Sequence, residues 1–160
     1  MDSLTLFSAP LQAAQIRGEL ERCNAVTQKY GLCLSDTDIA LLIQRRQETL
    51  RSAGRVEFGS GILEKLTLAF CDSPYLQQRD YAAVLDALQS IFYQQKTACR
   101  ERLTDDELLS ALRLIYDEVS RGDTDFLASL DPETLCAVAR RGSLRGTSLE
   151  EEPLWEVEDE

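Results

Sequence analysis

The sequence predicts an all-α fold, and three observations carry this prediction. Apolar residues recur at three- and four-residue steps along almost the whole chain, which is the spacing of one face of an α-helix. Capping residues and glycine stops divide this pattern into successive helices. Only the run "RVEF" has the composition of a strand, and one strand of that length cannot form a sheet. We therefore expect a compact bundle of about five long helices plus short ones.

The first predicted helix runs from about Pro10 to Tyr30 and stops at Gly31, because glycine readily adopts the left-handed conformation that ends a helix. Its expected apolar face consists of Ile16, Leu20, Cys23, Val26 and Tyr30. The second predicted helix begins after Ser35, with Asp38 completing a capping box, and ends near Gly54. Its expected apolar face consists of Ile39, Leu42, Ile43 and Leu50.

The third predicted helix runs from about Gly61 to Phe70, where "CDSPY" breaks it. Asp72 or Ser73 is then expected to cap the next segment, because Pro74 suits the first turn of a helix. The fourth and longest helix is expected from about residue 79 to residue 102. Its apolar face should consist of Tyr81, Val84, Leu85, Leu88, Ile91 and Phe92.

The fifth predicted helix starts at a capping box in "TDDE", formed by Thr104 and Glu107, and closes at Gly122. Its expected apolar face consists of Leu108, Leu112, Ile115 and Val119. A short turn follows around Phe126, and Asp131-Pro132 opens a last helix that stops at Gly142. The predicted organisation is one helical domain over residues 1–142 and a flexible acidic tail over residues 143–160.

The charge of the chain is concentrated in this tail. The net charge is −11, but the segment from Thr147 to the end holds seven of the 28 acidic residues and none of the 17 basic ones. The preceding residues therefore carry 21 acidic against 17 basic side chains, a net charge of −4. A mildly acidic body argues against binding to nucleic acid or to an anionic membrane surface, since both require a positive surface.

Cysteine and histidine content limits the chemistry further. None of the five cysteines forms a CxxC pair and the chain has no histidine, so the usual zinc patterns are absent and we expect no metal and no cofactor. An odd number of cysteines without a basic secretion signal favours reduced thiols and a cytoplasmic location. Cys71 beside Asp72 lacks a neighbouring base, so we interpret it as a small buried residue.

Three short stretches connect the chain to a known family. The segments "RVEFG", "FCDSPY" and "FY" are the most characteristic parts of a run that resembles a family of small all-helical bacterial proteins, classed only as a domain of unknown function. The resemblance covers roughly residues 16–118 and implies a helical fold in a bacterial cytoplasm. It implies no activity, cofactor or site residue, and on this basis the last helix and the tail are expected to be peculiar to this chain.

The stretch "GRVEFGSGILEKL", residues 54–66, is the first candidate site. The backbone N–H groups at the start of a helix attract anions, and glycine lets a ligand approach the backbone closely. The candidate ligand-binding residues are Arg55, Glu57, Gly59, Ser60, Gly61 and Lys65. The alternative is a structural corner between two helices, with Phe58 as an anchor. Glu57 and Glu64 favour this alternative because they would repel an anion.

Two further stretches suggest protein binding. The arginines of "QRRQETLRSAGR", chiefly Arg45, Arg46 and Arg51, would form a docking surface for an acidic partner, or simply a solvated helix face. The tail "LEEEPLWEVEDE" places Leu154, Trp155 and Val157 among acidic residues, a pattern typical of segments that fold onto a partner, although an inert solubilising tail is the alternative. A third alternative is that the acidic tail folds back onto the arginines of its own chain.

The function that the sequence favours is a non-catalytic protein–protein interaction or regulatory module with an unidentified protein partner. A small anionic-ligand binder that uses the Gly-Ser-Gly corner is the alternative. An enzyme is less favoured, because no histidine and no recognisable nucleophile pair is present.

Overall fold

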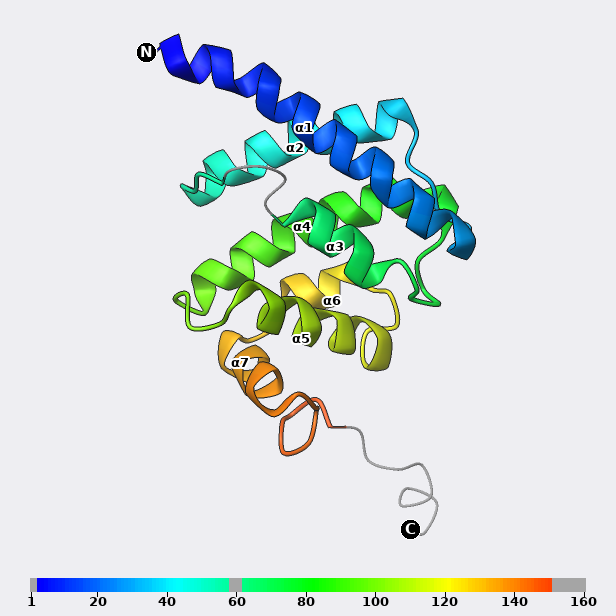
Figure 1. The fold of residues 1–160 in the computed structure, drawn as a ribbon. Coiled ribbons are helices and arrows are strands. Elements are labelled where there is room, and N and C mark those ends of the chain that lie inside the picture. The colour runs from blue at the N-terminus through cyan, green and yellow to red at the C-terminus, as the bar shows by residue number, and fades with distance from the viewer. Residues whose placement is uncertain (1–2, 58–61, 151–160) are drawn as a thin grey trace, which may run out of the picture.

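The computed structural model describes residues 3–57 and 62–150, and within these ranges it contains helices and turns but no strand, which confirms the all-α prediction (Figure 1). Seven α-helices and two short 3-10 helices follow one another in this described part. Their bounds are α1 Ser3–Thr27, η1 Gln28–Tyr30, α2 Asp36–Ala53, α3 Leu63–Phe70, η2 Gln78–Asp80, α4 Tyr81–Ala98, α5 Asp105–Glu118, α6 Thr124–Ala128 and α7 Pro132–Arg141.

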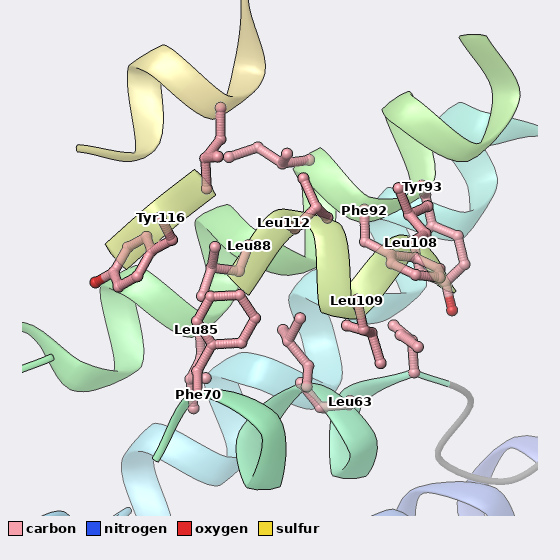
Figure 2. Close-up of a cluster of buried hydrophobic side chains, with 14 of the residues drawn as sticks. Leu63, Phe70, Leu85, Leu88, Phe92, Tyr93, Leu108, Leu109, Leu112 and Tyr116 are labelled. Atoms are coloured by element: carbon pink, nitrogen blue, oxygen red, sulfur yellow. The ribbon is translucent and has the colours of Figure 1, made fainter. Parts of the chain in front are cut away.

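The helices are arranged around α4, which packs against α2, α3, α5 and α6. The N-terminal helix α1 lies across α2 and α3 at one end of the molecule, whereas α7 packs on α5 at the other end. The central core lies where α3, α4 and α5 meet (Figure 2). The labelled side chains there are all buried: Leu63, Phe70, Leu85, Leu88, Phe92, Tyr93, Leu108, Leu109, Leu112 and Tyr116. Each buried side chain of this size stabilises the fold by roughly 1.5–3 kcal/mol relative to leaving it exposed.

Helix α1 differs from its prediction at both ends. It begins at Ser3 rather than at Pro10, and it ends at Thr27, where η1 takes over for the three residues up to Tyr30. Thr27 is also its last buried residue. The Thr27 hydroxyl donates a hydrogen bond of 2.9 Å to the Leu32 carbonyl, which satisfies this polar group inside the core. Val26 and Tyr30 are 42% and 47% exposed, so their assignment to the apolar face was wrong.

Most of the predicted capping signals are confirmed, but α5 ends at Glu118 and not at Gly122. The Ser35 hydroxyl accepts from the backbone N–H of Asp38 and the Asp38 carboxylate accepts from the Ser35 N–H, and Thr104 and Glu107 form the same reciprocal pair. Gly31, Gly54 and Gly142 adopt left-handed conformations at the ends of η1, α2 and α7. These signals are reliable because they act within four residues of sequence.

The predicted helix start at "CDSPY" is wrong. Residues 71–77 contain turns, and the chain becomes helical only at η2 and α4. The reason is tertiary, because the side chains of Asp72 and Ser73 bind Arg113 and Asp117 of α5 instead of capping a helix.

Helix α4 also ends earlier than predicted, at Ala98 rather than near residue 102. Cys99 caps the helix, and the next two residues, Arg100 and Glu101, have φ angles of 55° and 61°. Left-handed residues other than glycine are costly, and here they turn the chain sharply towards α5.

The segment after α7 is described only to residue 150. Leu144 and Leu149 of this segment are half-buried and pack against the core. The predicted domain boundary between residues 142 and 143, and the flexible character of the tail, remain predictions.

Candidate functional groove

The candidate anion site at residues 54–66 begins with Arg55, which is held by the end of α4. Its guanidinium donates to the Thr97 hydroxyl at 3.1 Å and forms an ion pair with Glu101. It also lies over the Tyr93 ring, 5.9 Å from the centroid, so the "RVEF" and "FY" stretches contact each other. These contacts fix the loop after α2 to α4 and occupy the charge of Arg55.

Glu57 contributes its backbone to the same corner. Its carbonyl accepts hydrogen bonds from Gln12 of α1 at 3.0 Å and from Arg46 of α2 at 3.1 Å. Helices α1 and α2 are therefore both joined to the loop after α2 at this one carbonyl. Gly59, Ser60 and Gly61 lie outside the described residues, and their predicted role stays a prediction.

Lys65 pairs with a different element from Arg55. Its ammonium lies 3.3 Å from the Asp106 carboxylate at the start of α5, whereas Arg55 binds at the end of α4. Each of the two cations assigned to the candidate anion site thus already has an acidic partner. The corner as described is a junction between α1, α2 and α4.

The arginines of α2 do not form one exposed surface. Arg45 pairs with Glu48 at 2.8 Å and with Asp86 of α4 at 3.1 Å, and Arg51 is exposed. Arg46 is only 1% exposed, so its assignment to a docking surface was wrong. Burial lowers the pKa of Arg46, an effect opposed by Tyr93, Glu57 and Glu19, and an arginine nevertheless keeps its charge.

The tail residues assigned to partner binding lie outside the described part of the chain. Leu154, Trp155 and Val157 all follow residue 150. Their predicted role therefore stays a prediction.

A groove of about 720 Å³ runs between α3 and α5. Helix α5 supplies residues at successive three- and four-residue steps, so one complete face of this helix borders the groove. The lining residues are Lys65, Leu68 and Ala69 from α3, and Asp106, Leu109, Ser110, Arg113, Leu114, Asp117 and Glu118 from α5. The floor is apolar: Leu109 is buried, while Leu68 is 39% exposed and Leu114 is half-buried.

Arg113 closes one end of this groove by joining α5 to α3. Its guanidinium donates to the Ala69 carbonyl and to the Asp72 carboxylate, both at 2.6 Å, and to Asp117 at 2.7 Å. Arg113 holds the pKa of Asp72 below its ordinary value through this hydrogen bond. The guanidinium also lies over the Phe70 ring, 5.9 Å from its centroid.

The stretch "FCDSPY" builds this end of the groove. Phe70 packs edge-on against Tyr116 with ring centroids 5.2 Å apart, and the Ser73 hydroxyl lies 2.7 Å from the Asp117 carboxylate. Gly122 approaches Tyr75 so closely that a Cβ on Gly122 would lie 2.9 Å from the Tyr75 Cβ. Cys71 is buried, as predicted, and burial raises the pKa of its thiol.

Lys65 and Asp106 join α3 to α5 at the other end of the groove. The groove is therefore preformed, with a cross-helix pair near each end and leucine side chains between them. Such a surface suits an apolar segment of another molecule, in particular an amphipathic helix.

The sequence interpretation missed this groove. One indication was available: Leu68 does not share the helical face of Leu63, Leu66 and Phe70, so an apolar residue was expected on the outer side of α3. The roles of Arg113 and Asp117 could not be inferred, because their partners in α3 and the following loop are 41 to 44 residues away.

Within residues 11–57 and 62–150, no group of three or more His, Cys, Asp or Glu side chains is placed to hold a metal ion. None of the helices in the described part of the chain is long and apolar enough to cross a membrane.

Comparison with known proteins gives one family. A family model described as a family of unknown function, DUF6323, matches residues 19–145. The match extends through α6 and α7, so the last helix is not peculiar to this chain. No curated protein and no solved structure matches the chain. The recognition made from "RVEFG", "FCDSPY" and "FY" is thus confirmed: the chain belongs to the DUF6323 family of unknown function.

Proposed function

We propose that this protein is a non-catalytic interaction module that binds a helical segment of another protein in the groove between α3 and α5. The observation that carries the proposal is the exposed apolar floor of this groove between two fixed ends. Leu68 is 39% exposed beside the buried Leu109, although α3 has a separate buried face. Apolar side chains that line a preformed groove are typical anchors for a partner helix.

The charges around the groove indicate the chemistry of the partner. Three acidic residues (Asp106, Asp117 and Glu118) and two basic ones (Lys65 and Arg113) line the groove, and Asp72 binds Arg113 at its edge. The surface therefore carries four negative and two positive charges, a net charge of −2. The α5 face from Asp106 to Glu118 is about 18 Å long. It fits an amphipathic helix of roughly three turns with an apolar face and basic flanking residues.

The experiment is capture of binding proteins from a lysate of the source cells on three immobilised proteins: the wild type, Leu68→Asp and Leu41→Asp. Leu41 of α2 is 45% exposed and does not line the groove, so Leu41→Asp is a matched control. We expect to capture a protein that binds the wild type and Leu41→Asp with similar affinity. Its affinity for Leu68→Asp should be lower by about tenfold or more. Hydrogen exchange of the complex should show protection in α3 and α5.

A captured protein that binds Leu68→Asp as well as it binds the wild type would exclude the groove as the docking site. Failure of all three proteins to retain any protein would contradict the interaction role. The alternative, a small anionic-ligand binder at residues 54–66, has weaker support because Arg55 and Lys65 each have an acidic partner.

A further inference from the structure

Two buried cysteines meet where the end of α4 reaches α7. Cys99 caps α4, Cys136 lies in the second turn of α7, and each is 1% exposed. Both thiols are free. Thirty-seven positions separate them in the sequence, so only the fold brings them together.

The contacts at this junction are specific. The Cys99 sulfur lies 3.8 Å from the carbonyl oxygen of Pro132, which is one helical turn before Cys136. The neighbouring ion pair between Arg102 and Glu133, 2.9 Å long, also joins the end of α4 to the first turn of α7. Burial, and a hydrogen bond with the Cys136 thiol, raise the pKa of Cys99 to about 12.

The other three cysteines differ in their surroundings. Cys33 is exposed, and its thiol contacts the Leu34 carbonyl. Cys23 and Cys71 are buried in the N-terminal half of the chain, and the Cys71 thiol contacts the Leu68 carbonyl in the last turn of α3. They serve as internal controls for the reactivity of Cys99 and Cys136.

We propose that Cys99 and Cys136 are a redox pair that a peroxide converts into a disulfide between α4 and α7. One thiolate attacks an oxygen of hydrogen peroxide, and the O–O bond breaks. The products are a sulfenic acid and hydroxide, and the hydroxide becomes water by taking the proton that the thiol had released. The sulfur of the other cysteine then attacks the sulfenic sulfur, forms the S–S bond and releases a second water. Two thiols are oxidised by two electrons in total, and one peroxide is reduced to two waters.

Burial makes this reaction slow, because little thiolate is present at neutral pH. The disulfide would close a loop that contains α5 and α6. It would also tie α7, which packs on α5, to the end of α4. The modification is independent of the proposed partner and is tested without one.

The experiment treats the full-length protein with hydrogen peroxide for several hours, unfolds it, alkylates the remaining thiols and digests it with trypsin. Cleavage after lysine and arginine places each of the five cysteines on a different peptide, with Cys99 on residues 97–100 and Cys136 on residues 122–140. We expect these two peptides to be joined in monomeric protein and to separate after reduction. The joined product should persist in Cys33→Ala and Cys23→Ala and be absent from Cys136→Ala.

Oxidation of Cys33 while the Cys99 and Cys136 peptides stay fully alkylated would overturn the proposal. Joining of Cys99 to any other cysteine would overturn it too. Wild-type protein oxidised in urea is the control for chance pairing of cysteines. If the disulfide between Cys99 and Cys136 forms in equal yield in urea and in the native protein, the proposal that the fold brings the pair together is refuted. Circular dichroism establishes that each variant is folded, and Cys99→Ala replaces Cys136→Ala if the latter does not fold.

Discussion

Arg46 shows how far the surroundings of a single residue change its role. The charge pattern of "QRRQETL" suggested an exposed basic face, yet the Arg46 side chain is buried and donates to the carbonyl of Glu57. A buried guanidinium is stable only where hydrogen bonds and nearby charges replace water. Arg46 therefore joins α2 to the corner that precedes α3.

We expect Arg46→Ala to lower the free energy of unfolding by about 2–4 kcal/mol, because it leaves a cavity and removes a buried hydrogen bond. Arg51→Ala on the same helix is the control and should change it by less than about 0.5 kcal/mol, since Arg51 is exposed. Urea denaturation followed by circular dichroism measures both. Equal effects of the two substitutions would show that Arg46 has no special role.

At the scale of elements, the helix starts that carry a capping box follow from local sequence, whereas other starts and several helix ends do not. Both capping boxes form where the sequence places them. The end of α4 differs, because Arg100 and Glu101 adopt left-handed conformations that glycine would adopt more easily. Glu101 gains an ion pair with Arg55 in this conformation, which links the end of α4 to the corner after α2.

We expect Arg100→Gly to raise the free energy of unfolding by about 0.5–1 kcal/mol, because glycine removes the strain of a positive φ angle. Ala83→Gly, at an exposed position in the first turn of α4, should lower it by roughly 0.5–1 kcal/mol. Thermal and urea denaturation of the two variants should therefore shift in opposite directions. A loss of stability in both variants would show that the left-handed conformation of Arg100 is not strained.

At the scale of the whole molecule, contacts with the core continue beyond the last helix. Leu144 and Leu149 follow the last helix and pack against the core. The segment after Gly142 has no helical periodicity, so the sequence suggested that the body ended there.

We expect Leu149→Ala to lower the free energy of unfolding by roughly 1 kcal/mol, since a half-buried leucine contributes about half of a fully buried one. Leu11→Ala is the control, because Leu11 is 74% exposed, and should change it by less than about 0.5 kcal/mol. Denaturation in urea compares the two. No effect of Leu149→Ala would place the end of the folded body before residue 149.

The sequence by itself determined the all-α class, the capped starts of α2 and α5, the helix stops at Gly31, Gly54 and Gly142, and the family. Each of these depends on residues within about one turn of one another, or on short characteristic stretches. The burial of Arg46, the contacts of Asp72 and Ser73, the groove between α3 and α5, and the meeting of Cys99 with Cys136 were decided only by the tertiary structure. The physical reason is separation along the chain: Arg55 meets Glu101, Lys65 meets Asp106, and Arg113 meets the Ala69 carbonyl across 41 to 46 residues. Local periodicity identifies the face that a helix buries. The packing of whole helices decides which polar side chains are also buried and which apolar side chains stay exposed.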